Sequence, residues 1–426
     1  MKDLLPSFKT KIPGPKSRAL ARQLHRFESR NITCISEHWP VFWQRAAGAN
    51  VWDVDGNRYL DLTAAFGVAN VGHTNPRVVA AIKTQAAKLL HAMGDVHPNE
   101  LKLQLARELV ALTFGRWGRE PTVRSGRRVG ARGLQPQARV IFANSGAEAV
   151  EAALKTAAIH TKRPGVIAFE GAYHGLTYGA LDATWRSDFR TPFSKQLGRF
   201  TTHVPFGSLP SLPHPIDHYG AVIVEPIQGR GGIVVSPDDF LSKLRNVCGQ
   251  HGLVLIFDEI YSGFCRTGRW FACEHWNVVP DIVCVGKAMA GGFPISACVG
   301  RAEVMDSWPE SNGEAIHTST FLGNPLGCAA ALAAIGEMKR MKLDARSRKL
   351  GEWLARRLAE FGTVRGKGLM LGVEVGNAVP IVEKLLQRGV LALPEGNRGE
   401  ILGVTPPLVI TERQLEFALK ELSRWL

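Results

Sequence analysis

Short apolar runs alternate with helix-like stretches between residues 139 and 300, and this alternation constrains the fold more than any other feature of the chain. The runs cover residues 140–142, 166–169, 221–224, 253–257, 282–285 and 296–299. Strands separated by crossover helices build a mostly parallel sheet that is covered on both faces. The alternation therefore predicts an α/β domain, and polar residues that directly follow these strands are expected to meet at one edge of the sheet.

The two ends of the chain carry a different pattern. Residues 52–62 favour a hairpin that turns at Asp55-Gly56, and residues 368–375, 390–393 and 400–404 favour strands around a helix at residues 382–387. Thr411 and Gln414 have the spacing of a capping box, which predicts a last helix that runs to Leu426. We expect residues 1–62 and 326–426 to form one small α+β domain beside a large domain of residues 63–325.

Composition narrows the class of protein. A chain of 426 residues that is 45% hydrophobic and 21% charged is typical of globular proteins, and no segment is apolar over the length that a signal peptide or a membrane span needs. We therefore expect a cytoplasmic enzyme that makes no membrane contact. The seven cysteines lack the spacing of metal ligands, so we expect reduced core cysteines and no metal site.

A net charge of +14 raises the hypothesis of a nucleic-acid partner. Much of the excess is local, because residues 116–139 contain Arg116, Arg119, Arg124, Arg127, Arg128, Arg132 and Arg139. That stretch has glycine and proline but no apolar periodicity, and Trp117 is its one aromatic residue. Such a composition is typical of a solvated loop, so we expect no nucleic-acid partner.

Two charged residues follow predicted strands and favour aldehyde chemistry. Lys287 comes after the strand at 282–285, and Asp258 lies twenty-nine positions earlier, after the strand at 253–257. A desolvated lysine loses its proton easily and condenses with an aldehyde. Residues 144–148 open an alanine-rich helix, where backbone amides and small side chains suit a phosphate. Together these features predict a site for a phosphorylated pyridine aldehyde.

Five segments resemble the class III aminotransferases. They are Asn-Ser-Gly-Ala-Glu-Ala-Val-Glu-Ala (144–152), Gly-Ala-Tyr-His-Gly (171–175), Val-Glu-Pro-Ile-Gln-Gly (224–229), Asp-Glu-Ile-Tyr-Ser-Gly-Phe-Cys-Arg-Thr-Gly (258–268) and Thr-Ser-Thr-Phe-Leu-Gly-Asn-Pro (318–325). The resemblance extends from about residue 40 to the C-terminus. It implies fold type I with a seven-stranded sheet, pyridoxal 5′-phosphate as cofactor, and a homodimer whose active sites lie at the subunit interface.

The resemblance also assigns roles around the cofactor. Lys287 and Asp258 are the expected catalytic residues: Lys287 forms the Schiff base and then moves the substrate proton, while Asp258 keeps the pyridine nitrogen protonated. Tyr173 and Ile260 would pack on the two faces of the ring. Thr320 would reach the phosphate of the neighbouring subunit.

The remaining expected cofactor contacts are Ser145, Gly146 and Ala147 at the phosphate, with His174, Glu225 and Tyr261 nearby. For Glu225 a structural acid and a direct role are both open, and for His174 we favour a structural hydrogen bond. Tyr261 stands where many family members have glutamine, and its phenol is expected to bond the 3′ oxygen of the cofactor.

The expected substrate-binding residues are Phe66, Leu176, Arg230 and Gly403. Family members that act on GABA, ornithine or acetylornithine have arginine at position 176, glutamate at 230 and arginine at 403, where they hold substrate carboxylates. All three devices are altered here, which predicts a bulkier or less charged donor. Arg230 could itself bind the carboxylate of the oxo acid, or it could be an exposed arginine in a glycine-rich turn.

We therefore expect transfer of an amino group from an amine, or from an ω- or β-amino acid, to a 2-oxo acid such as pyruvate. Two alternatives share the fold and the Schiff base: an amino-acid racemase or epimerase, and a decarboxylating aminotransferase. A third is a basic binding protein without catalysis, which the presence of both Lys287 and Asp258 disfavours.

Overall fold

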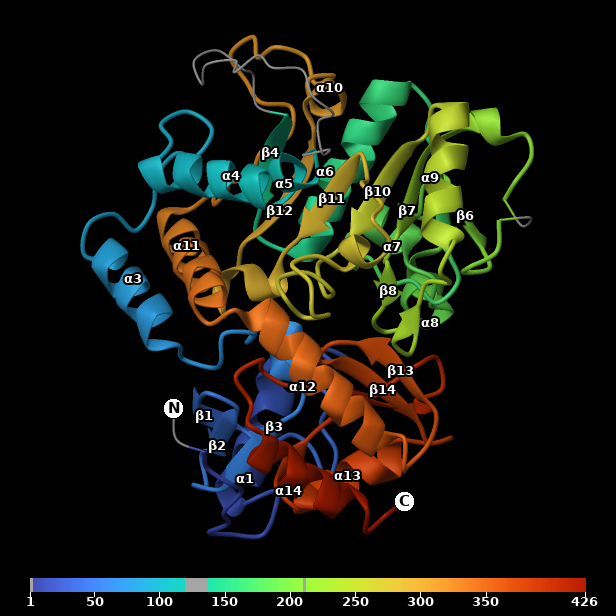
Figure 1. Cartoon of the computed structure of the whole chain (residues 1–426). Helices are drawn as coiled ribbons and strands as arrows, with labels where there is room; N and C mark the ends of the chain where they lie inside the picture. Colours follow the sequence, from blue (N-terminus) through green and yellow to red (C-terminus); the bar gives the residue numbers. More distant parts are fainter. Residues whose placement is uncertain (1–2, 119–136, 210–211) are drawn as a thin grey trace, which may run out of the picture.

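The computed structural model describes residues 3–118, 137–209 and 212–426. Figure 1 shows a large αβα part around the central sheet, with the N-terminal and C-terminal segments packed together below it. The arginine-rich stretch discussed above lies mostly outside the described residues. Its described flanks are ion-paired, Arg116 to Glu274 at 3.4 Å and Arg139 to Asp306 at 3.0 Å.

The central sheet has seven strands in the order β4-β12-β11-β10-β7-β5-β6, which confirms the predicted sheet. Their bounds are β4 (Ala138–Ala143), β5 (Gly165–Phe169), β6 (Thr201–Val204), β7 (Tyr219–Val224), β10 (Val254–Asp258), β11 (Ile282–Val285) and β12 (Ser296–Arg301). Only β12 runs antiparallel to its neighbours. The apolar runs did not include β6, because this edge strand is Thr-Thr-His-Val, with three polar residues that are only partly buried.

Helices cover both faces of this sheet, as Figure 1 shows. Helix α6 (Gly146–Thr161) packs a face of small residues, among them Ala149, Ala152 and Ala153, against β11 and β12. The other helices of this part are α3 (Pro76–Ala86), α4 (Glu100–Leu112), α5 (Phe114–Trp117), α7 (Tyr178–Ala183), α8 (Ser187–Arg190), α9 (Phe240–His251), α10 (Ala302–Met305) and α11 (Pro325–Arg340). The small alanine side chains let α6 lie close to the sheet, and this packing sets the position of the helix N-terminus.

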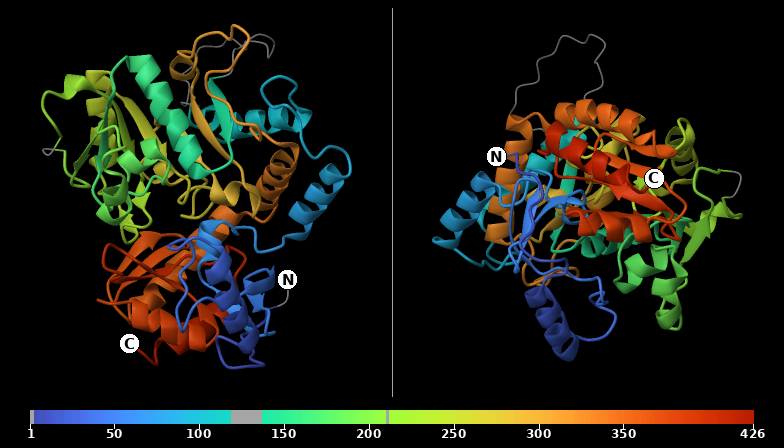
Figure 2. Two further views of the ribbon diagram at one scale, coloured as in Figure 1. Left: turned by 180° about the vertical axis from the view of Figure 1, so that it is seen from behind. Right: turned by 90° about the horizontal axis from the view of Figure 1, so that it is seen from below.

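The two chain ends meet in one smaller body, where blue and red segments lie side by side in Figure 2. One sheet has the order β1-β2-β3-β15, so β15 (Val390–Leu391) from the C-terminal part pairs in parallel with β3 (Arg58–Asp61) from the N-terminal part. The second has the order β13-β14-β17-β16. Its strands are β13 (Val364–Lys367), β14 (Met370–Glu374), β16 (Leu393–Glu395) and β17 (Ile401–Val404), while β1 (Trp43–Ala47) and β2 (Asn50–Asp53) complete the first sheet.

Local signals in this body were partly right. The hairpin turns as predicted, with Gly56 at φ +84° between β2 and β3. The capping box of Thr411 is present, but α14 (Glu412–Leu422) ends before the predicted Leu426. The predicted strand at residues 390–393 is divided between two sheets as β15 and β16, and β13 was not predicted. The other helices are α1 (Pro15–Phe27), α2 (Ala64–Gly67), α12 (Leu343–Leu358) and α13 (Val379–Gln387).

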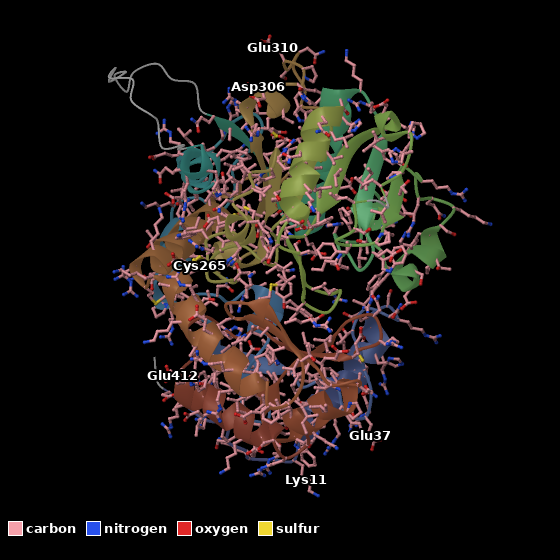
Figure 3. The ribbon with its side chains drawn as sticks, turned by 45° about the vertical axis from the view of Figure 1, so that its right-hand side comes forward. Lys11, Glu37, Cys265, Asp306, Glu310 and Glu412 are labelled. Carbon is pink, nitrogen blue, oxygen red and sulfur yellow. The ribbon has the colours of Figure 1, made fainter. Side chains whose placement is uncertain are left out.

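A buried arginine links the segments around the site. The guanidinium of Arg266 donates to the carbonyl oxygens of Leu369 and Pro406 and to the side chain of Asn70. Figure 3 labels the adjacent Cys265 at the level where the upper and lower parts meet. Burial lowers the pKa of Arg266 to about 10, so it remains a cation that holds these segments together at neutral pH.

The sequence also made predictions about the cysteines and about membrane-spanning segments. All seven cysteines are free, and six are buried as predicted, whereas Cys34 is exposed. Among the described residues, none of the helices combines the length and the apolar character that a membrane crossing requires.

Candidate active site

A cavity of about 420 Å³ lies at the carboxyl ends of the central strands, beside the smaller body. Thirteen predicted site residues line it: Phe66, Ser145, Gly146, Ala147, Tyr173, His174, Leu176, Glu225, Arg230, Asp258, Ile260, Tyr261 and Lys287. Two further lining residues, Gly175 and Glu395, were not predicted. The strand-end rule places Glu225, Asp258 and Lys287 at this edge of the sheet, and the structure brings these three to one cavity.

Lys287 enters the cavity from a tight turn after β11. Its backbone has φ +44°, a left-handed conformation that costs a lysine energy and is concentrated at functional sites in proteins. The ammonium is buried, which lowers its pKa below the usual range, while Asp258 and Glu225 act in the opposite direction. The Nζ atom lies 4.3 Å from the centre of the Tyr261 ring. A buried amine of this kind gives up its proton more easily than a surface lysine.

Asp258 ends β10, and each of its two carboxylate oxygens has its own hydrogen-bond partner. Oδ1 accepts a hydrogen bond from the amide of Ile260 at 3.1 Å, and Oδ2 lies 2.8 Å from Nδ1 of His174. The carboxylate accepts this hydrogen bond from Nδ1–H, and the buried Nε2 of His174 has no partner among the described residues. This bond gives His174 the structural role that the sequence favoured, since it orients Asp258.

The start of α6 forms one wall of the cavity. Ser145 caps the helix by accepting from the amide of Glu148 at 3.3 Å. A Cβ atom on Gly146 would lie 2.9 Å from Cδ1 of Ile260, and one on Gly175 would lie 2.6 Å from Cβ of Ala147. These close approaches need glycine at both positions. They bring the first-turn amides, which attract anions, to the edge of the cavity.

Glu225 and Tyr173 form the wall behind the cavity. Glu225 accepts hydrogen bonds from the backbone amides of Tyr173 at 3.0 Å and of Gly229 at 3.1 Å. Burial raises the pKa of Glu225 to about 7. Through these two bonds Glu225 holds together the loops that carry Tyr173 and Gly229. The centre of the Tyr173 ring lies 5.0 Å from the guanidinium carbon of Arg230.

Tyr261 lines the cavity but uses its hydroxyl elsewhere. The ring fits between two glycines, since a Cβ on Gly67 or on Gly229 would lie 2.4 Å from a ring atom. The hydroxyl donates to Oγ1 of Thr405 at 3.1 Å. To form the expected bond to the 3′ oxygen of the cofactor, the Tyr261 hydroxyl would have to give up its bond to Thr405 or accept a second hydrogen bond.

Apolar side chains form the outer part of the cavity. Phe66 and Leu176 are 53% and 49% exposed, so both keep an apolar surface open towards an incoming molecule. Phe66 has φ +61° within α2, a second left-handed residue at the cavity. Leu176 follows Gly175 on the loop that carries Tyr173, where it offers an apolar wall.

Two predicted residues do not line this cavity. Thr320 is exposed on the segment before α11, and Gly403 is buried within β17. A Cβ atom on Gly403 would lie 2.9 Å from Cγ of Glu395, so this glycine makes room for that side chain. Glu395 ends β16 in the antiparallel sheet of the smaller body, where the strand-end rule for parallel sheets does not apply, so no sequence signal marked it.

The residues at the cavity fit pyridoxal 5′-phosphate. A buried lysine amine, a carboxylate oriented by His174, and helix amides beside small residues are the groups that an aldehyde, a pyridine nitrogen and a phosphate require. Among the described residues, no group of three or more histidine, cysteine or acidic side chains is arranged to bind a metal ion.

Comparison with known sequences gives a consistent result. A family model described as "Aminotransferase class-III" matches residues 34–426. An acetylornithine aminotransferase from Methanopyrus kandleri is 40% identical over 391 residues, which cover 90% of this chain and 94% of that protein. Another from Methanosarcina mazei is 37% identical over 392 residues, with coverage of 90% and 91%.

Solved structures have the same architecture. The ornithine aminotransferase from Toxoplasma gondii ME49 superposes with a TM-score of 0.83 at 30% identity, covering 96% of this chain and 94% of that one. An amine transaminase from an uncultivated Pseudomonas species, solved in its PLP-bound form, gives a TM-score of 0.80 at 25% identity, with coverage of 93% and 97%. The similar proteins thus include acetylornithine, ornithine and amine transaminases.

Proposed function

The chain belongs to the class III aminotransferases, which are pyridoxal-phosphate enzymes, and from this premise we propose the donor and the acceptor. It transfers an amino group from an amine, or from an ω- or β-amino acid, to a 2-oxo acid such as pyruvate. The observation that carries this proposal is the cavity lining, which combines Arg230 with the apolar side chains of Phe66 and Leu176. Membership of this family removes the hypothesis of a binding protein without catalysis.

We assign the chemistry to two residues. Bound pyridoxal phosphate supplies an electron-accepting ring that stabilises negative charge at the substrate Cα. The amine of Lys287 would hold the cofactor, and its lowered pKa suits it to accept a proton from the substrate Cα as a general base. Asp258, oriented by His174, would keep the ring nitrogen protonated through a charge-assisted hydrogen bond.

Arg230 is assigned to the oxo acid. Its guanidinium stacks over Tyr173 with 5.0 Å between the guanidinium carbon and the ring centre, and within the described part of the chain it forms no ion pair. An arginine that makes no direct ion pair in a partly enclosed site binds a carboxylate well, which is worth about 2 kcal/mol or about a thirty-fold change in affinity, although the charge of nearby Glu395 also acts on Arg230. The amine donor needs no such contact.

The test is the KM for pyruvate in Arg230→Ala. We expect a rise of about thirty-fold, with a smaller rise in Arg230→Lys, which keeps the charge but not the fork of donors. Arg398→Ala is a matched control, because Arg398 is an exposed arginine on the neighbouring turn. An unaltered KM in Arg230→Ala would remove the role given to this residue.

Transfer from N-acetylornithine is the second candidate function. It is favoured by the 40% identity to a protein named acetylornithine aminotransferase over most of both chains. The positions that hold substrate carboxylates in such enzymes are Leu176, Arg230 and Gly403 here. An arginine side chain at 403 would meet Glu395, so this candidate would need a different way to bind the donor carboxylate.

We further propose a cytoplasmic homodimer in which Thr320 reaches the phosphate bound by the partner protomer. Exposed apolar side chains near Thr320 support a covered surface: Leu90, Met93, Val96 and Phe321 are each more than half exposed. A hydrogen bond from Thr318 to Asp95 ties the two segments of this surface together. Side chains of this size are costly to leave in water, so a second copy is the expected cover.

A further inference from the structure

A carboxylate with no hydrogen bond or ion pair from the described residues lines the cavity. Glu395 lines it together with Lys287 and Arg230. Asp258 and Glu225 each accept two hydrogen bonds, but among the described residues the carboxylate of Glu395 accepts none and forms no ion pair. Glu395 is partly buried at the cavity, so a ligand that supplies a donor could form a charge-assisted hydrogen bond with its free carboxylate oxygens.

The backbone around Glu395 is fixed rather than loose. The amide of Gly396 donates to the carbonyl of Arg230 at 3.1 Å, and the guanidinium of Arg186 donates to the carbonyl of Gly396 at 2.6 Å. Glycine at position 403 leaves space for the Glu395 side chain, because any Cβ there would press on its Cγ. These backbone hydrogen bonds and the space at Gly403 therefore hold the Glu395 side chain at the cavity.

The charge state of Glu395 depends on what enters. Enclosure raises its pKa to about 7, and the nearby charges of Arg230, Lys287 and Arg186 act in the opposite direction. A cation placed beside the carboxylate would favour its ionised form further. Among the described residues Arg230 makes no direct ion pair with Glu395, because its guanidinium stacks on Tyr173, so its charge acts on the carboxylate from a greater distance.

We propose that Glu395 forms a cation subsite beside Lys287 and selects amine donors that carry a second ammonium group, of which a linear diamine is the simplest. This rests on the proposed function, because the first amine must react at the lysine-bound cofactor. The second ammonium then donates to Glu395, while the methylene chain lies along Leu176 and Phe66. Arg230 remains available for the carboxylate of the oxo acid that follows.

The experiment follows the half-reaction of the holoenzyme without an oxo acid. Loss of the visible cofactor absorbance is measured against the concentration of 1,4-diaminobutane and of butylamine, which gives an apparent Kd for each. For the wild type we expect the diamine to bind at least about tenfold more tightly at pH 8. Glu395→Gln should bring the ratio close to one, and Glu395→Asp should retain part of it.

The pH dependence gives a second measure of the same subsite. Both amines of the diamine stay protonated in solution up to about pH 9, since alkyl ammonium groups have pKa values near 10. The carboxylate forms as the pH rises through about 7. The preference for the diamine over the monoamine should therefore grow between pH 6 and pH 8 in the wild type and stay flat in Glu395→Gln.

Two results would overturn the subsite. One is an equal preference for the diamine in the wild type and Glu395→Gln. The other is a raised KM for pyruvate in Glu395→Gln with the diamine preference intact, since Glu395 would then serve Arg230 and not the donor.

A tertiary diamine separates this inference from the proposed function. N,N,N′,N′-tetramethyl-1,4-diaminobutane has two charges but no transferable amino group, so it is tested as a competitor against whichever donor the enzyme uses, N-acetylornithine included. If only N-acetylornithine reacts, the proposed function fails. Weaker competition in Glu395→Gln than in the wild type would still support the subsite, and equal competition in both would contradict it.

Discussion

At the scale of single residues, Lys287 combines burial with a strained backbone. Its φ of +44° and its lowered pKa both follow from its place in the turn after β11, where the chain leaves the sheet at the cavity. Strain of this kind persists only when surrounding packing enforces it. The packing of Ala288, Met289 and Ala290, all buried, supplies that support and leaves the amine as the reactive group.

The residue-scale prediction concerns this amine. Lys287→Ala removes the general base but leaves the helix start and Asp258 in place, so the variant should fold and still bind pyridoxal phosphate. We expect a loss of turnover of roughly 100-fold or more, measured as product formed from donor and pyruvate at saturation. Near-normal turnover would show that another group moves the proton.

At the scale of elements, the start of α6 depends on a glycine. Gly146→Ala would place a Cβ 2.9 Å from Cδ1 of Ile260, so the helix start or Ile260 must shift, at a cost of about 1–3 kcal/mol. We expect a Kd for pyridoxal phosphate raised at least about fivefold, measured by titration of the apoenzyme.

Gly249→Ala is the matched control for this variant. Gly249 also lies in a helix, α9, but a Cβ there would meet nothing within 4 Å. Alanine in an open helical position is favourable, so the control should keep or raise stability and leave cofactor affinity as it was. Equal cofactor affinity in Gly146→Ala and the wild type would show that the approach of α6 to Ile260 is not needed.

The sequence predicted the elements around the site better than those elsewhere. Buried parallel strands such as β10 and β11 are continuous apolar runs, so their polar end residues stand out. Strands of the smaller body are short and half-buried, and β13 was missed because Val364–Lys367 has no apolar alternation. Glu395 was missed for a different reason. The sequence predicted one strand at residues 390–393, whereas the structure has two short strands, β15 and β16, in different sheets.

At the scale of the whole molecule, contacts between distant segments complete the site. Arg266 joins the turn after β10 to residues 70, 369 and 406, and β15 pairs with β3 across most of the chain length. A single sequence indicates that such segments exist but does not specify which ones meet. The placement of Glu395 against Gly403 and Arg230 is a property of this assembly, and it distinguishes the cavity from one built around an arginine at 403.

The central claim is that Leu176, Arg230 and Gly403, which replace the usual carboxylate contacts, disfavour GABA and N-acetylornithine and favour an amine as donor. Its most direct test is kcat/KM of the wild type with pyruvate for four donors side by side: 1,4-diaminobutane, butylamine, GABA and N-acetylornithine. The account predicts that both amines exceed GABA and N-acetylornithine, with the diamine highest. A higher kcat/KM for N-acetylornithine or GABA than for both amines would contradict it.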